Sequence, residues 1–171
     1  MLKNIANFHN INDYLPLLNA VIITDLFVIF LLNVKIIKSN VLRKWYYQYN
    51  LSAVIADVLI IMIGLIITRA IYYYIFKSFS IIKFIFLSVI VQIIHDILFY
   101  VFFSNVPKGT NKMLDTFKEY ATEVSYRAIL SDSCMMIMSC LIAYYLVNQS
   151  TNVNIITLIV IMYLLPYLLY N

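Results

Sequence analysis

Four aspartates each lie inside a separate apolar stretch of this 171-residue chain: Asp25, Asp57, Asp96 and Asp132. An ionised carboxylate is costly to place among apolar groups, so isolated acidic residues in such stretches mark polar sites with a role. They can join helices through hydrogen bonds, or they can carry protons or cations across a membrane. The residue types alone leave both kinds of chemistry open.

A polar stripe accompanies one of these aspartates. Ser88, Gln92, His95 and Phe99 recur at helical spacing, with Asp96 beside them. Neighbouring residues leave a helix about 100° apart, so His95 and Asp96 are poorly placed to hold one metal ion together. The stripe could pass protons as far as Phe99. The alternative is a buried histidine that is satisfied by its neighbours.

Motifs for soluble-enzyme chemistry are missing from the sequence. The two glycines cannot form a glycine-rich phosphate loop, and the two cysteines do not form a C-x-x-C motif. Cys134 and Met138 could offer soft ligands to Cu(I), but sulfur side chains more often fill apolar packing positions. We therefore expect no enzyme activity, no cofactor and no metal.

The composition indicates which elements must position these residues. With 64% hydrophobic and 12% charged residues, the chain has too little polar material to cover a soluble globule. Few glycines and prolines favour long helices over a membrane barrel. The sequence predicts an all-α polytopic transmembrane helix bundle that forms one domain, residues 1–171. The expected spans are about 14–37, 51–76, 81–104, 124–147 and 153–170.

Basic residues in the connections predict the orientation of the bundle. Those of the first and third connections are Lys35, Lys38, Arg43, Lys44, Lys108, Lys112, Lys118 and Arg127. Those of the opposite side are Lys3, Arg69, Lys77 and Lys83. Because positive charge favours the cytosolic side, the first and third connections and the C-terminus are expected in the cytosol.

The third connection contains a short amphipathic segment near residues 111–123. Its apolar face comprises Met113, Leu114, Phe117, Tyr120 and Val124. Its polar face comprises Lys112, Asp115, Lys118, Glu119 and Glu123. This spacing predicts a helix on the membrane surface, which serves either as a solvated connector or as a surface for partners.

An internal repeat relates the second and fourth spans at an offset of 75 residues. The matched positions are Ala53, Asp57, Gly64 and Thr68 in the second span and Ala128, Asp132, Ser139 and Ala143 in the fourth. Small residues on one helical face permit close helix packing, so these faces are expected to meet near the two aspartates. Chance similarity between apolar helices is the alternative.

Several short segments between about Trp45 and Tyr145 resemble a known family. They are KWY (44–46), LSAVIADV (51–58), QIIHDILFY (92–100), VPKGTNK (106–112), FKEYA (117–121) and ILSDS (129–133). Together they resemble small multi-span membrane proteins of large cytoplasmic DNA viruses, the giant viruses. The resemblance implies a location in the virion internal membrane and host endomembranes. It carries over no catalytic residue.

Two functions remain open, and the first is favoured. In the first, the protein is a structural or scaffolding component that links a viral internal membrane to capsid or assembly partners. The expected partner surface is Arg43, Lys44, Trp45, Lys112 and Lys118, and the partners are lipid, other proteins or a second copy, with no nucleic acid. The alternative is a proton or cation channel or transporter that uses the intramembrane carboxylates and His95. Asp→Asn substitution should spare a scaffold and disable an ion path.

Overall fold

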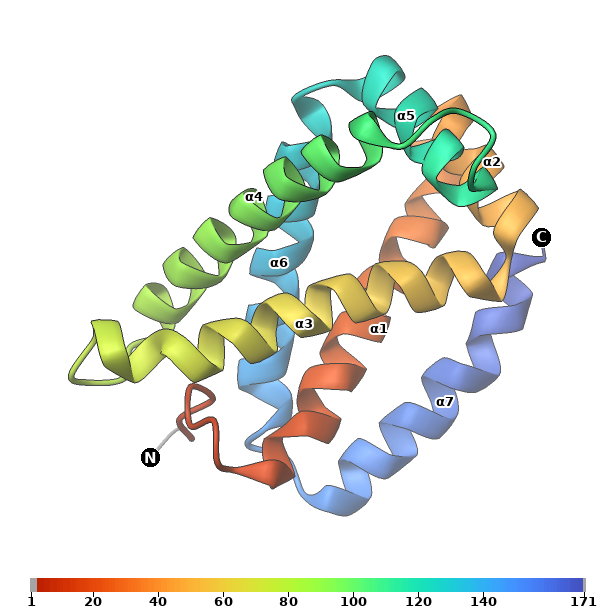
Figure 1. The fold of residues 1–171 in the computed structure, drawn as a ribbon. Coiled ribbons are helices and arrows are strands. Elements are labelled where there is room, and N and C mark those ends of the chain that lie inside the picture. The colour runs from red at the N-terminus through yellow and green to blue at the C-terminus, as the bar shows by residue number, and fades with distance from the viewer. Residues whose placement is uncertain (1–2, 171) are drawn as a thin grey trace.

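The computed structural model describes residues 3–170, and within that range every regular element is a helix (Figure 1). The elements are η1 (Ile11–Asp13), α1 (Tyr14–Asn33), α2 (Asn40–Tyr49), α3 (Leu51–Ile75), α4 (Ile81–Asn105), α5 (Lys112–Val124), α6 (Arg127–Leu146) and α7 (Thr151–Leu169). Five of them, α1, α3, α4, α6 and α7, are long and apolar enough to cross a membrane. The expected all-α polytopic bundle is therefore confirmed.

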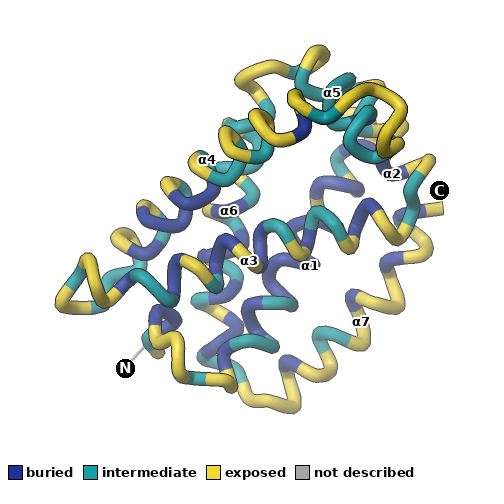
Figure 2. The backbone as a smooth tube through the Cα atoms, viewed as in Figure 1, coloured by how far each residue is buried: buried dark blue, intermediate teal, exposed yellow. Residues whose placement is uncertain are grey.

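Helix α1 is the central element of the bundle. It packs against α3, α6 and α7, and α4 packs against α3 and α6. Leu17, Ala20 and Val21 of α1 are fully buried. Figure 2 shows the contrast between α1, which is largely buried, and α7, whose outer side is exposed. Because the exposed side of α7 is apolar, it suits contact with lipid.

The first helix ends earlier than the sequence indicated. It stops at Asn33 instead of reaching 37. Lys35 has a φ of 61°. The backbone amides of Ile36 and Ile37 both donate hydrogen bonds to the carbonyl of Leu31, at 3.0 and 3.2 Å. A left-handed residue with such backward bonds is a common way to end a helix. Apolar residues past this point therefore continue as a turn.

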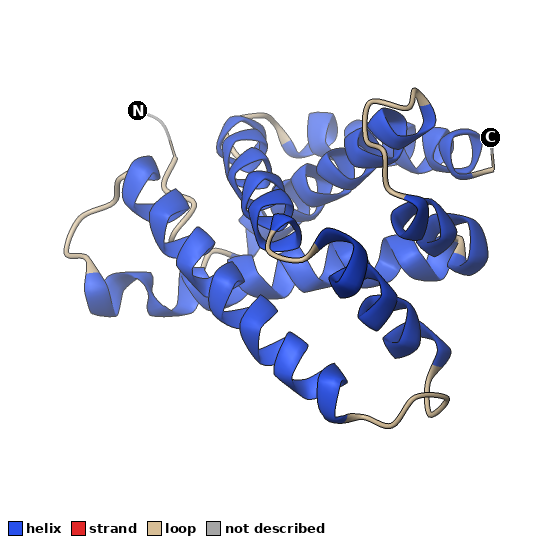
Figure 3. Ribbon diagram, turned by 90° about the horizontal axis from the view of Figure 1, so that it is seen from above, coloured by secondary structure: helices blue, strands red, loops and turns tan. Residues whose placement is uncertain are grey.

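Helix α2 was not predicted as a separate helix. Ser39 caps its N-terminus by accepting from the amide of Leu42 at 3.0 Å. Asn50, with a φ of 48°, separates α2 from α3. Trp45 and Tyr46 are its buried residues. Figure 3 shows the loops of the fold in tan between the helices in blue. The first connection is therefore a second amphipathic helix.

The expected amphipathic segment near 111–123 is helix α5, and it packs against α2. Glu119 accepts from Lys44 at 2.6 Å. Glu123 accepts from the Ser39 hydroxyl at 2.6 Å and from the Val41 amide at 3.2 Å, so it also satisfies a free N–H at the start of α2. The first and third connections therefore form one two-helix layer at the same end of the bundle.

Candidate functional site

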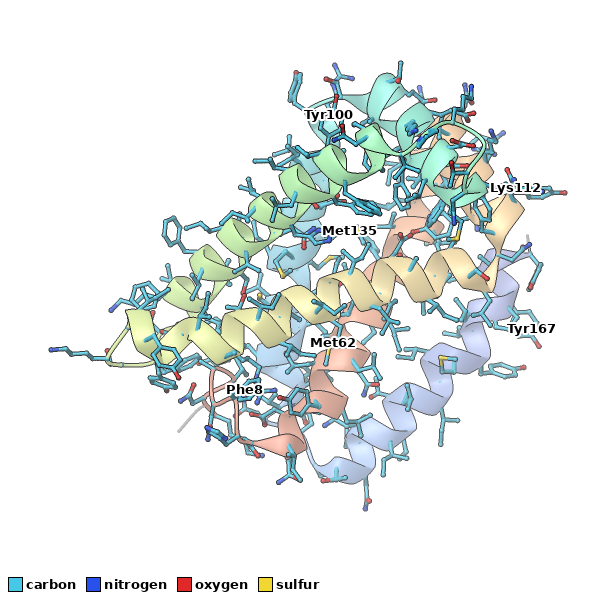
Figure 4. All side chains as sticks on the ribbon, viewed as in Figure 1. Phe8, Met62, Tyr100, Lys112, Met135 and Tyr167 are labelled. Atoms are coloured by element: carbon cyan, nitrogen blue, oxygen red, sulfur yellow. The ribbon has the colours of Figure 1, made fainter. Side chains whose placement is uncertain are left out.

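A cavity of about 390 Å³ lies beneath the α2 and α5 layer. Asp57 of α3, Asp96 of α4 and Asp132 of α6 all line it. Figure 4 marks two further lining residues, Tyr100 on α4 and Met135 on α6. Three of the aspartates that lie far apart in the sequence thus share one cavity.

Asp25 and Asp57 hold helix α2 against the bundle. The indole N–H of Trp45 donates to Oδ2 of Asp57 at 2.9 Å, and the hydroxyl of Tyr46 donates to Oδ1 of Asp25 at 2.7 Å. Burial, together with the carboxyls of Asp57 and Asp25, raises the pKa of Tyr46 well above its ordinary value. The Tyr46 hydroxyl therefore stays a donor. Asp25 is 1% exposed and lies behind Tyr46, outside the cavity lining.

The polar stripe of α4 forms a second part of the lining. Gln92 donates from Nε2 to Oδ1 of Asp96 at 2.7 Å. Nδ1 of His95 lies 3.3 Å from the same oxygen, so these adjacent side chains meet despite leaving the helix in different directions. Gln92 is 1% exposed, and its Oε1 has no partner among residues 3–170. Oδ2 of Asp96 is also buried without a partner there. Two buried acceptors of the lining residues thus lack a donor among the described residues.

Tyr120 of α5 and Asp132 of α6 complete the acidic part of the cavity lining. Burial first, and then the carboxyls of Asp132 and Asp57, raise the pKa of Tyr120. The Tyr120 hydroxyl therefore stays protonated beside these groups. Asp57 accepts a hydrogen bond from Trp45, whereas no side chain among residues 3–170 donates a hydrogen bond to Asp132.

Aromatic rings make up much of the remaining wall. They are Trp45, Tyr46, Phe99, Tyr100, Phe103, Phe117, Tyr120 and Tyr126. Phe117 is the centre of this group, with its ring centroid 4.7 Å from that of Trp45 and 5.0 Å from that of Phe99. No Lys or Arg belongs to the described lining. The cavity therefore combines carboxylates with aromatic faces and has no fixed positive charge.

The opposite end of the bundle is closed by an arginine. Arg69 of α3 is 1% exposed, donates to the carbonyls of Asn7 and Asn10 and lies 3.4 Å from Oδ2 of Asp13. Its guanidinium also stacks on the ring of Tyr14 at 4.5 Å. From the sequence, Arg69 was counted among the basic residues of the connections on that side. Instead it is a buried anchor for the segment that precedes α1.

The small residues of the internal repeat pack against different helices. A Cβ at Gly64 would lie 2.9 Å from Cε of Met136, so the end of the Met136 side chain of α6 reaches the backbone of α3 there. Ser139 donates to the Thr24 hydroxyl of α1 at 3.0 Å. Ala53 is fully buried, whereas Ala128 lines the cavity. The two matched faces thus meet several helices, and α1 and α4 take most of the packing of α6.

The expected partner surface is only partly at the surface. Arg43, Lys44 and Lys112 are exposed, and Lys118 is half-buried with its ammonium bonded to the Val106 carbonyl. Trp45 is 4% exposed, so its placement on that surface was wrong. The physical reason is its bond to Asp57, which turns the indole inward. Trp45 belongs to the cavity.

Residues 3–170 contain no group of three or more His, Cys, Asp or Glu side chains that could hold a metal ion. No protein-family model, curated protein or solved structure matches the chain. The site must therefore be interpreted from its own geometry.

Proposed function

We propose that this membrane protein binds a cation in the cavity beneath α2 and α5 and acts as a cation transporter. The observation that carries the proposal is the gathering of Asp57, Asp96 and Asp132 around one cavity whose described lining has no Lys or Arg. A carboxyl group in an apolar setting either takes up a proton or pairs with a positive charge. A bound cation supplies that charge.

The closed end supports a transporter over an open channel. A channel needs polar groups or water along its full length. Beyond Gln92, the Ser88 hydroxyl is bonded to the Phe84 carbonyl of its own helix at 2.9 Å, and the fully buried Tyr72 and Phe84 follow. The buried Arg69 then repels cations at that end. Access from one side at a time is how transporters work.

Cation exchange across sealed vesicles tests the transporter directly. Purified protein is reconstituted, and counterflow of a labelled cation is followed for a panel of inorganic and organic ions. The wild type should show saturable counterflow, and Asp132→Asn should abolish it while keeping its helical spectrum. Asp115→Asn is the matched control, because Asp115 bonds the Gly109 amide outside the cavity. Flux equal to that of empty vesicles for every ion would contradict transport.

We propose the scaffold function as the second candidate, because α2 and α5 form a braced layer with exposed basic residues. Asp25 and Asp57 anchor α2, and Glu119 and Glu123 join it to α5. The resemblance to giant-virus membrane proteins supports a virion internal membrane and capsid or assembly partners. If this function is correct, Asp132→Asn should leave assembly in infected cells unchanged, and reversal of the basic charges at Arg43 and Lys112 should impair it.

The proposed orientation keeps α2, α5 and the C-terminus in the cytosol. Burial of Arg69 supports it, because this residue no longer adds exposed positive charge to the opposite side. The cavity would then open toward the cytosol. Single-cysteine labelling at Lys38 in sealed vesicles of known orientation tests this proposal.

A further inference from the structure

We infer that the cavity takes a primary alkylammonium group, and this inference rests on the proposed cation function. The ligand class follows from three features of the cavity: its size, its aromatic walls and its two unpartnered acceptors. A soluble amine and an ethanolamine lipid headgroup share this chemistry.

The size of the cavity does not suit a bare inorganic ion. Its volume is about 390 Å³, whereas one water molecule takes roughly 30 Å³ in the liquid. A dehydrated divalent cation needs several oxygen ligands packed closely around it. Residues 3–170 offer no group of three acidic, His or Cys side chains for that purpose. An organic cation fills this space better.

The walls of the cavity suit an organic cation. Ring faces attract ammonium groups, and the attraction strengthens when water is excluded. Phe99, Phe117 and Tyr120 come from α4 and α5 and line the cavity together with Asp132. Aromatic faces and a carboxylate thus surround one space. A carbon chain beside the ammonium group can rest on the same rings.

The unpartnered acceptors favour a ligand that carries hydrogen-bond donors. Gln92 is 99% buried, lines the cavity, and leaves Oε1 without a partner among the described residues. Oδ2 of Asp96 is also buried without a hydrogen-bond partner among these residues. A buried acceptor without a donor is costly. A primary ammonium offers three donors, whereas a quaternary ammonium offers none.

The ligand can reach the cavity from the edge of the bundle. Tyr100 and Tyr126 both line it and are 55% and 71% exposed. The wall therefore continues to the surface that faces lipid or the interface. A headgroup could enter along this route, and a soluble amine could enter beneath α5.

The single tryptophan of the chain provides the test, because Trp45 lines the cavity and donates to Asp57. Purified protein in phosphatidylglycerol nanodiscs is titrated with butylammonium chloride while Trp45 fluorescence is recorded. We expect the fluorescence to change in a saturable manner with butylammonium. Neither 1-butanol nor KCl at the same ionic strength should change it. Asp132→Asn should bind butylammonium about tenfold more weakly. Asp115→Asn should bind as the wild type does.

Discs of phosphatidylethanolamine distinguish the two sources of the ligand. If the headgroup occupies the cavity, added butylammonium should bind weakly in the phosphatidylethanolamine discs, because the headgroup competes with it. It should bind more tightly in the phosphatidylglycerol discs. If a soluble amine is the ligand, the affinity should be the same in both lipids. Either result supports the alkylammonium assignment. Asp96→Asn repeats the test should Asp132→Asn fail to fold.

The outcomes also separate this inference from the proposed function. An Asp132-dependent change with Na⁺ or K⁺ and none with butylammonium would overturn the organic ligand and leave cation binding intact. No response to any cation would overturn both. Equal binding of butylammonium and 1-butanol would overturn the role of charge.

Discussion

The indole N–H of Trp45 donates to the carboxyl of Asp57 across 2.9 Å, so helix α2 and the acidic lining of the cavity form one structural unit. Trp45 comes from an amphipathic connection, and Asp57 comes from a membrane-spanning helix. Both residues line the cavity, so this bond forms part of one of its walls. The same bond explains why an aromatic residue of a connection is buried.

Replacing Trp45 with Phe should loosen α2. An aromatic ring is kept, although it is smaller, and Asp57 loses its donor; an unsatisfied buried acceptor alone costs about 1–3 kcal/mol. We expect a lower melting temperature in detergent by circular dichroism. Tyr47→Phe is the control, because Tyr47 is 79% exposed on the same helix. Equal melting of the two variants would mean that the bond contributes nothing to the docking of α2.

Gly64→Leu should destabilise the packing of the Met136 side chain against α3. Even a Cβ there would lie 2.9 Å from the terminal methyl of Met136, so a larger side chain must displace it. Overpacking of this kind costs about 1–3 kcal/mol. Gly64→Ala should cost less, because the methyl of Met136 is the movable end of a flexible side chain. Ile63 is 52% exposed on the same helix, so Ile63→Leu should melt at the same temperature as the wild type.

Arg69→Met should release the segment before α1. The substitution leaves Asp13 without its cation, and removing one partner of a buried ion pair costs about 3–5 kcal/mol. We expect faster proteolysis within residues 3–13 and a lower melting temperature. Lys77→Met, in the exposed loop between α3 and α4, serves as the matched loss of charge. Protection of residues 3–13 equal to that in the wild type would contradict an anchoring role for Arg69.

Single-cysteine labelling in sealed vesicles should place α2 and α5 on one side of the membrane. The labelling sites are Lys38→Cys, Lys108→Cys and Lys77→Cys, each in a background with Cys134 and Cys140 replaced. We expect the first two to share accessibility to an impermeant reagent and the third to show the opposite. Labels at 38 and 108 on opposite sides would contradict the arrangement of the spans.

The spans could be predicted from sequence because lipid demands long apolar helices, whatever their packing. Helix α2 was missed because it is short, although Ser39 and the spacing of Leu42, Trp45 and Tyr46 were usable signals. The internal repeat predicted that Asp57 and Asp132 lie near one another, but their gathering with Asp96 around one cavity could not be derived. It depends on how each helix is rotated and which neighbour it packs against, and one apolar face resembles another in sequence.

Single residues of the candidate site show the same limit on predicting contacts between helices from sequence. The sequence placed Asp96 beside the α4 stripe, and in the structure Asp96 accepts from Gln92, because residues four apart share a helical face. Asp25 was grouped with them by its isolation among apolar residues. In the structure it contacts Tyr46 and serves α2. Local periodicity therefore predicts partners within one helix, whereas partners on other helices require the tertiary packing.

The most direct test of cation binding is the melting temperature of the purified protein with and without cations at constant ionic strength. A ligand that binds only the folded state raises the melting temperature as its concentration increases. We predict this rise for the wild type and for Asp115→Asn, and its loss in Asp132→Asn that remains folded. Identical melting of the wild type and Asp132→Asn across the whole cation series would contradict binding in the cavity.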